Sequence, residues 1–463
     1  MKNVLKNIQE IINNAAKEAY QETNDEPIPQ FGGAHKWPIN CTVGPGLEGA
    51  IACESKIGYV NGAKGWLVYR GYNIFDLCAN STFEEVSYLL LHGNLPKQTE
   101  LNHFKNKLFE YSHLNKTLRQ LMGFPVEEMS AMGALRLGSD LMRQELTSYD
   151  RFEDRPTTMD AISSDEDSFA METPPKGAKH ATYEFKIKKS KQRRKKVFAR
   201  KTALESCCQL IAGVSTIIGA VARIHNRCMP LEPRSDLSFA GNLLYMLTGK
   251  EPSLVEEKMM DISLILHADH GMNASTFSTM VVASTLADIY FAVGSGIAAL
   301  SGALHGGANE AVINMLREIG TVENVEPWVE KRLSQKKRIS GFGHRVYKVY
   351  DPRARVLSPL ANLLVKEKPE FTHLYQVAQA LEKTVMTSMG KEKKLFPNVD
   401  FYSGIIYTCL GINDELFTPL FAASRVAGWT ARVLEYIENN RIFRPRALYT
   451  GDFNQAYKSI EKR

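Results

Sequence analysis

Hydrophobic residues recur at spacings of three and four along most of the chain, from about Thr82 onward. This spacing places apolar side chains on one face of a helix. Short breaks that contain Gly, Pro or Asn separate the segments. The pattern therefore predicts a mainly helical protein, with clear helices at 83–93, 203–224, 237–249 and 418–437.

Other segments add to the predicted elements. Residues 1–20 carry apolar side chains at helical spacing among Lys and Glu, which predicts an amphipathic helix. Residues 278–299 are apolar nearly all round and rich in Ala, Gly and Ser, which predicts one buried helix. Strand-like alternation is confined to a few short pieces such as 56–60 and 65–69, which predict a small hairpin near the N-terminus.

Length and composition limit the class of protein. A chain of 463 residues exceeds one ordinary core, so we expect two domains, or a large helical domain carrying a smaller one. No segment stands out in the sequence as the run of roughly 18 apolar residues that a membrane span needs. The first twenty residues contain Glu10 and Glu18, no Arg and no continuous apolar stretch, which is unlike a secretory or mitochondrial leader. We expect a cytoplasmic protein without membrane association.

The cysteines form an odd set without a CxxC pair, so neither a disulfide framework nor a zinc ribbon is indicated. We expect buried, reduced thiols. The seven are Cys41, Cys53, Cys78, Cys207, Cys208, Cys228 and Cys409.

Residues 148–196 interrupt the helical pattern. The segment opens acidic, passes through Pro174 and Pro175, and ends in the basic run KIKKSKQRRKK. Between Thr147 and Lys201 the basic residues exceed the acidic ones by five, which accounts for most of the net charge of +6. We predict a solvated, mobile insertion. Nucleic-acid binding is an alternative for this basic run alone, not for the body of the protein.

Two clusters in the C-terminal half contain histidines near glycines. His267 and His270 follow an apolar helix, but their HxxH spacing lacks the cysteine or carboxylate pair that would complete a metal site, so we expect no metal. His305 precedes two glycines and a helical run. A helix N-terminus disfavours the imidazolium form, so a neutral His305 could donate a hydrogen bond to a developing enolate.

A third cluster, 339–354, offers His344, Arg345, Lys348 and Arg353. It begins with GFGHRV, which superficially opens a dinucleotide fingerprint. The third glycine of that fingerprint is missing, and no βαβ pattern surrounds it. A Rossmann site is therefore not indicated.

A fourth cluster, 395–407, places Asp400 among apolar and aromatic residues, which would raise its pKa and make it a usable base. Arg425 and Arg444 follow downstream. Their guanidinium groups suit bidentate capture of carboxylates, so the substrate should carry carboxylates.

These clusters occur in an order and in local contexts that resemble the citrate synthase family. The most specific motifs are ALHGGANEAV, GFGHRVYKVYDPRA and FPNVDFYSG, and the likeness extends upstream to ESKIGYVNGAKGWLVYRGYNI. It covers nearly all of the chain except the N-terminal tail and the insertion. The family usually has a short connection where this chain carries the insertion, and a His-Pro-Met-Asp type of segment where this chain reads VEEMSAMG.

The resemblance implies roles for individual residues in condensing acetyl-CoA with oxaloacetate, the entry step of the tricarboxylic acid cycle. Asp400 would remove a proton from the acetyl methyl group, His305 would stabilise the enolate, and His344 would polarise the ketone of oxaloacetate. The groups implied to bind oxaloacetate are His270, His344, Arg353, Arg425 and Arg444. The candidates for contacting the CoA phosphates are the basic residues Lys336, Lys337, Arg338 and Lys348, with a solvated surface face as an equal alternative for them. Acetyl-CoA is a substrate, and no cofactor is implied.

The resemblance also implies an architecture. A large helical domain would comprise 1–305 and 412–463, and a small domain, 306–411, would close over the active site. Because Arg444 is similar to an arginine that the neighbouring subunit supplies, we expect a homodimer or a higher homo-oligomer.

Two alternatives remain open at this point. The first is a 2-methylcitrate synthase that uses propionyl-CoA through the same residues, because one methyl group in an apolar pocket contributes only about 1–3 kcal/mol. The second is an inactive synthase scaffold that binds a partner through the basic insertion. Deleting 148–196 would distinguish the enzyme from the scaffold, because an enzyme is predicted to retain its condensation activity without the insertion.

Overall fold

The computed structural model describes residues 2–23, 37–153, 193–390, 395–452 and 455–463. The predicted insertion therefore lies mostly outside the described residues. The helix before the insertion, α6, ends at Glu153, and the helix after it, α7, begins at Arg193.

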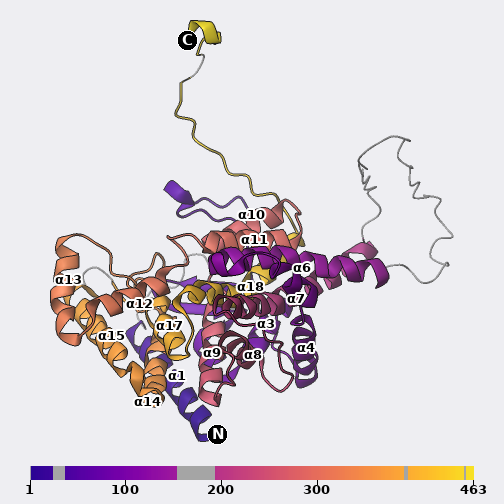
Figure 1. The fold of residues 1–463 in the computed structure, drawn as a ribbon. Coiled ribbons are helices and arrows are strands. Elements are labelled where there is room, and N and C mark those ends of the chain that lie inside the picture. Colours follow the sequence, from indigo (N-terminus) through magenta and orange to yellow (C-terminus); the bar gives the residue numbers. More distant parts are fainter. Residues whose placement is uncertain (1, 24–36, 154–192, 391–394, 453–454) are drawn as a thin grey trace, which may run out of the picture.

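The predicted mainly helical fold is confirmed (Figure 1). The helices are α1 Lys2–Glu22, α2 Ile74–Asn80, α3 Phe83–His92, α4 Gln98–Tyr111, α5 Asn115–Leu121, α6 Ala131–Glu153, α7 Arg193–His225, α8 Phe239–Thr248, α9 Leu254–His267, α10 Ala274–Ser284, α11 Ile289–Leu300, α12 Ala308–Ile319, α13 Val325–Ser334, α14 Pro352–Glu367, α15 Thr372–Val385, α17 Val399–Cys409 and α18 Phe417–Ile437.

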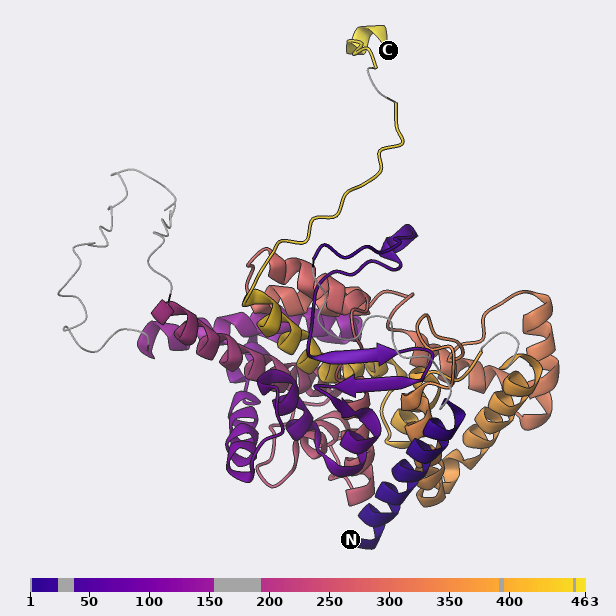
Figure 2. The same cartoon turned by 180° about the vertical axis from the view of Figure 1, so that it is seen from behind.

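The predicted hairpin is present, and a short third strand extends it. β1 (Gly58–Asn61), β2 (Trp66–Tyr69) and β3 (Tyr72–Asn73) form an antiparallel sheet in the order β1-β2-β3, with Gly58 opposite Tyr69. Figure 2 shows the two longer strands on the side of the molecule seen from behind. The side chain of Asn73 then accepts a hydrogen bond from the amide of Phe75 and begins α2.

The predicted single helix over 278–299 is wrong, because the structure breaks it into α10 and α11, which pack on each other. The break lies at 285–288. Leu286 has a positive φ of 65°, and the Asp288 side chain accepts a hydrogen bond from the amide of Tyr290 to cap α11. Both halves are apolar, so the periodicity of the hydrophobic residues does not reveal the turn.

The amphipathic helix predicted at the N-terminus is confirmed as α1. Its apolar side is buried at Ile8, Ile12 and Ala15. The helix packs against both α2 and α14. At the α14 side, Arg355 forms an ion pair with Glu18 at 3.7 Å.

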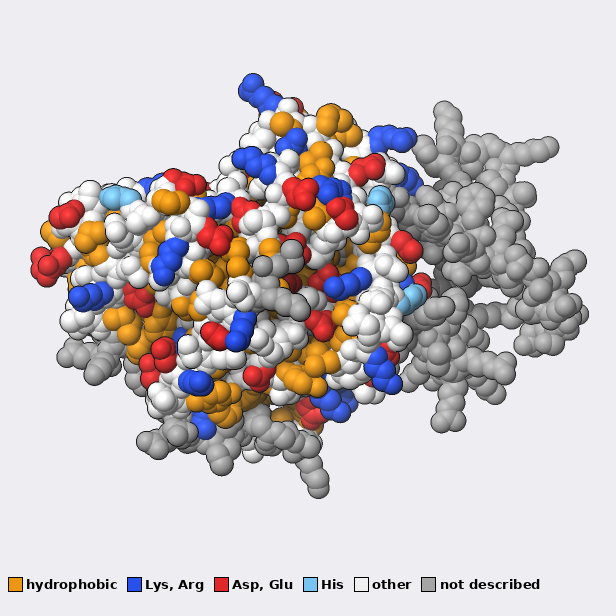
Figure 3. All heavy atoms as spheres, turned by 90° about the horizontal axis from the view of Figure 1, so that it is seen from below, with side chains coloured by type: hydrophobic (Ala, Val, Ile, Leu, Met, Phe, Trp, Pro, Cys, Tyr) orange, Lys and Arg blue, Asp and Glu red, His pale blue; other side chains and the backbone are white. Residues whose placement is uncertain are grey.

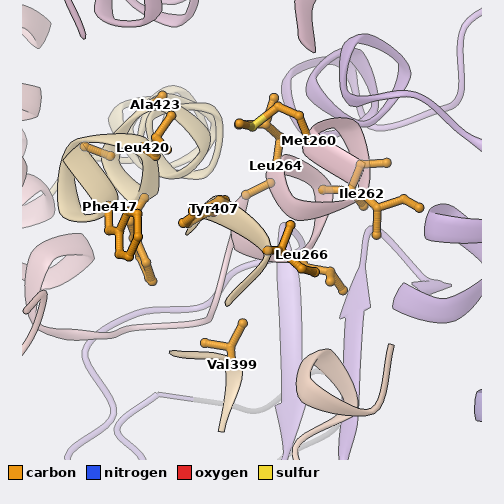
Figure 4. Packing of buried hydrophobic residues seen from close by; sticks show 14 of the residues in the cluster. Met260, Ile262, Leu264, Leu266, Val399, Tyr407, Phe417, Leu420 and Ala423 are labelled. Carbon is orange, nitrogen blue, oxygen red and sulfur yellow. The ribbon is translucent and has the colours of Figure 1, made fainter. Parts of the chain in front are cut away.

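The helices gather into two groups (Figure 1). The group α12–α15 with α17 lies on one side, and helices α3, α4 and α6–α9 lie on the other. The first group comes from the segment that we predict to be the small domain, 306–411, and its exact boundaries stay a prediction. One hydrophobic cluster passes through both groups. Figure 4 shows Leu266 of α9, Val399 and Tyr407 of α17, and Phe417 of α18 in this cluster.

One helix in the described part of the chain has the length and hydropathy of a membrane span, contrary to the expectation from sequence. It covers Ala203–His225 of α7, with a mean hydropathy of 1.7 in its most apolar window. Of that window, 83% is buried inside the protein, where α7 packs against α6, α8 and α18. A central helix of a core passes the same test of composition.

All seven cysteines are free, and Cys78, Cys207, Cys208 and Cys409 are buried as predicted. Cys41 is exposed, and Cys53 and Cys228 are half-buried, so for these three the prediction is wrong.

On the face seen in Figure 3, acidic and basic side chains are interspersed among apolar ones.

Candidate active site

A single cleft is lined by all seven residues to which catalysis or oxaloacetate binding was assigned. These are His270, His305, His344, Arg353, Asp400, Arg425 and Arg444. They come from both groups of helices, from the loops between them and from the segment after α18. Of the four basic residues predicted to contact CoA, Lys337 and Arg338 line the cleft. Lys336 and Lys348 are not among its described lining residues.

His344 lies in the loop before α14. Its Nδ1 atom accepts hydrogen bonds from the amides of Val346, at 3.0 Å, and Tyr347, at 3.1 Å. Because Nδ1 is an acceptor, the neutral ring carries its proton on Nε2. Burial lowers the pKa of His344 to about 4, with a smaller contribution from the positive charge of Arg353. The ring is thus a neutral donor of one hydrogen bond into the cleft.

His305 lies in the turn between α11 and α12. Its Nε2 atom accepts from the amide of Ser275 at 3.2 Å, and the Ser275 hydroxyl lies 2.8 Å from the same atom. The hydroxyl also lies 2.8 Å from Oδ1 of Asn273, but the amide can only donate, so the neutral ring carries its proton on Nδ1. Burial lowers the pKa of His305 to about 4, with a smaller contribution from Arg425.

The helix N-terminus that contacts His305 differs from the one that the sequence indicated. The glycines after His305 lead into α12, yet the amide that reaches the ring belongs to the first turn of α10, which Asn273 caps by accepting from Thr276. The positive end of the α10 dipole favours the neutral ring. The neutral form of His305 is therefore favoured by α10 and not by α12.

His270 lies beside His344, with ring centroids 5.1 Å apart. Its Nε2 atom is 3.3 Å from the hydroxyl of Tyr347. Burial lowers the pKa of His270 well below its usual value, and the charge of Arg353 adds to this effect. Two neutral imidazoles therefore lie next to each other at the cleft.

Arg353 is buried and forms a two-pronged ion pair with Asp351, with Nε to Oδ1 at 3.0 Å and the second nitrogen to Oδ2 at 2.8 Å. Asp351 also caps α14 by accepting from the Arg353 amide at 2.9 Å. This carboxylate was missed in the sequence. An Asp-Pro pair ahead of a helical run is a helix start, and that signal could have identified it.

Arg425 lies on α18 and is buried. Its Nε atom donates to the carbonyl oxygen of His267 at 2.6 Å, whereas one terminal nitrogen is buried without a hydrogen-bond partner in the described structure. An unpaired donor on a buried cation costs free energy. A carboxylate in the cleft would supply the missing acceptor.

Asp400 is the second residue of α17, and its amide donates to the side chain of the capping residue Asn398 at 3.0 Å. Burial raises the pKa of Asp400 to about 6, against the opposing effect of Arg353. The aromatic and apolar setting predicted for it is confirmed, since Phe401 and Tyr402 are fully buried. A carboxylate with this pKa is ionised at neutral pH and a stronger base than an exposed one.

Arg444 lies in the extended segment beyond α18, where the chain leaves the body of the molecule (Figure 1), and it is exposed. It lines the cleft of its own chain. A role for Arg444 in a neighbouring subunit stays a prediction.

His267, the first histidine of the HxxH pair, is bonded within its own helix. Nδ1 of His267 lies 2.7 Å from the carbonyl oxygen of Ser263, and the ring packs edge-on against Phe421. Within the described ranges, no group of three or more His, Cys, Asp or Glu side chains is placed to hold a metal ion.

Comparisons with known proteins agree with this geometry. The family model "Citrate synthase, C-terminal domain" matches residues 46–446. The citrate synthase of Synechocystis sp. is 40% identical over 418 residues, covering 90% of this chain and 93% of that protein. The crystal structure of citrate synthase from Pyrobaculum aerophilum is similar with a TM-score of 0.75 at 35% identity, covering 93% of this chain and 100% of that one.

A second solved structure bears on ligands. It is the citrate synthase of Thermoplasma acidophilum in a ternary complex with carboxymethyl coenzyme A and oxaloacetate, with a TM-score of 0.74 at 31% identity, covering 89% of this chain and 97% of that one. The matched family model spans most of the chain, and the curated relative matches at well over 30% identity. The chain belongs to the citrate synthase family.

Proposed function

We propose that this protein condenses acetyl-CoA with oxaloacetate and hydrolyses the resulting citryl-CoA to citrate and CoA. The observation that carries the proposal is the cleft lined by Asp400, His305 and His344. There, one carboxylate has the pKa of a usable base, and the two imidazoles are neutral hydrogen-bond donors. Family membership and the ligands of the Thermoplasma acidophilum structure support the same reaction.

The first step is proton transfer. Asp400 takes a proton from the methyl group of acetyl-CoA, and the electron pair moves onto the thioester oxygen. The Nδ1–H group of His305 donates to that oxygen, because Nε2 is already an acceptor for Ser275. The carbon acid is weak, so the base and the donor must act together.

The second step forms the carbon–carbon bond. The enolate carbon attacks the ketone of oxaloacetate, and the Nε2–H group of His344 donates to the carbonyl oxygen as negative charge develops there. His270, Arg353, Arg425 and Arg444 hold the two carboxylates. Water then cleaves the thioester of citryl-CoA, and the CoA thiol departs with a proton.

Closure and assembly belong to the same proposal. The small domain, 306–411, closes over bound oxaloacetate and excludes water until condensation is complete. Lys337 and Arg338 line the cleft and suit the phosphates of CoA. The working form is a homodimer in which Arg444 completes the neighbouring site, and the protein serves the tricarboxylic acid cycle in the cytoplasm.

The function is tested by measuring thiol release from acetyl-CoA with oxaloacetate, in parallel with propionyl-CoA. We expect release with both substrates present, a higher kcat/KM with acetyl-CoA, and no release when oxaloacetate is omitted. A clear preference for propionyl-CoA would instead identify a 2-methylcitrate synthase. No release with either thioester would favour the inactive scaffold.

The pH dependence follows from the site. Asp400 must be ionised to accept a proton, so activity is lost as the pH falls through its pKa of about 6. His305 and His344 stay neutral over this range because their pKa values are about 4. We expect kcat/KM to fall about tenfold per pH unit below pH 6 and to recover when the enzyme is returned to neutral pH. A profile that stays flat down to pH 5 would contradict the role of Asp400.

A further inference from the structure

Tyr347 lies behind the cleft and is almost fully buried, with 2% of its surface exposed. Its amide donates to Nδ1 of His344 at 3.1 Å, and its hydroxyl lies 3.3 Å from Nε2 of His270. One residue therefore reaches both imidazoles on the oxaloacetate side, the first through its backbone and the second through its side chain.

The ring of Tyr347 makes the remaining contacts. Its centroid is 4.9 Å from that of His344 and 5.4 Å from that of His270. The guanidinium carbon of Arg353 lies 5.7 Å from the ring centroid, within the range in which a cation is attracted to an aromatic face. Tyr347 thus touches three of the groups proposed to bind oxaloacetate without lining the cleft itself.

The hydroxyl matters most for His270. A buried imidazole with an unpaired nitrogen is costly, and its ring can turn about the bond to Cβ. The hydroxyl can donate or accept, so it serves either neutral tautomer of His270. It therefore fixes the plane of the ring and the direction in which its other nitrogen points.

We propose that Tyr347 is a positioning residue for oxaloacetate, whose hydroxyl orients His270 and whose ring supports His344 and Arg353. This inference rests on the proposed function of the cleft. Removing the hydroxyl should weaken oxaloacetate binding with little effect on the chemical steps, because the hydroxyl bonds His270, whereas the amide and the ring that contact His344 are kept.

The test is isothermal titration calorimetry of oxaloacetate with the full chain and its Tyr347→Phe variant. Phenylalanine keeps the ring and adds no atoms, so the fold is retained, which circular dichroism checks. We expect Kd to rise about fivefold, the effect of one lost hydrogen bond, with kcat at saturating substrates within about twofold of the parent. The matched control is Tyr290→Phe. The hydroxyl of Tyr290 donates to Gln209 at 2.6 Å outside the cleft, so the Kd of this variant for oxaloacetate should equal that of the parent.

A double-mutant cycle separates positioning from general structure. If Tyr347 acts through His270, adding Tyr347→Phe to a His270→Ala background should cost no further affinity. Equal or tighter binding by Tyr347→Phe, or losses that simply add in the cycle, would overturn the inference. A parent enzyme that neither binds oxaloacetate nor releases thiol would instead overturn the proposed function itself.

Discussion

Replacing Asp400 with asparagine is expected to lower kcat about a thousandfold, within the range of general base catalysis. The amide has the shape of the carboxylate but cannot take the methyl proton. Asn398 still caps α17 through the amide of residue 400, so the fold should persist. Initial rates of thiol release measure the effect, and calorimetry should show oxaloacetate binding within about threefold of the parent, because Asp400 is not proposed to contact it.

Asp261→Asn is the matched control. Burial raises the pKa of Asp261 to about 6, as it does for Asp400, but Asp261 pairs with Lys258 at 2.8 Å and accepts from the amide of Phe83, away from the cleft. This variant should lose stability and keep its kcat. If Asp400→Asn retained more than a tenth of the parental kcat, Asp400 would not be the base.

Replacing His305 with alanine is the second large effect. We expect kcat to fall about a hundredfold to a thousandfold, the loss that follows removal of one preorganised donor to a developing oxyanion. Thiol release measures the overall rate, and exchange of the acetyl methyl protons with deuterated solvent, followed by nuclear magnetic resonance, measures enolisation directly. Both should fall together, because the donor acts at the first step.

His225→Ala serves as the control for His305. His225 bonds to Glu415 at 2.8 Å and to the carbonyl oxygen of Val126 at 3.0 Å, and it does not line the cleft. The kcat of the His225→Ala variant should match that of the parent. Normal enolisation in His305→Ala would exclude the proposed role of the imidazole.

The fold was largely predictable from the sequence, because helical periodicity is strong in α3, α8 and α18. The break between α10 and α11 was not, since Leu286 and Asp288 interrupt a stretch that is apolar on both sides. For such a stretch, tertiary packing decides where the helix ends.

The candidate site was also only partly predictable from the sequence. The seven residues recognised from motifs line one cleft, although the motifs say nothing of the neighbours that fix their protonation. Ser275 is thirty residues from His305 in the sequence, and Tyr347 is 77 residues from His270. Such pairs form only when the chain folds, so a single sequence cannot predict them. Only positive charge pointed to Lys336 and Lys348, and charge does not specify which way a side chain faces.

The exposed thiol of Cys41 has a practical consequence for any reagent that detects free CoA by its sulfhydryl group. Cys41 will react with the dye before substrate is added, whereas burial raises the pKa of Cys208 and Cys409 to about 12 and keeps these thiols unreactive. Each native chain thus contributes an absorbance offset from Cys41 before turnover begins, and the half-buried Cys53 and Cys228 add to it more slowly. A denatured chain will colour much more strongly, so the size of the offset also reports how much of a preparation is folded.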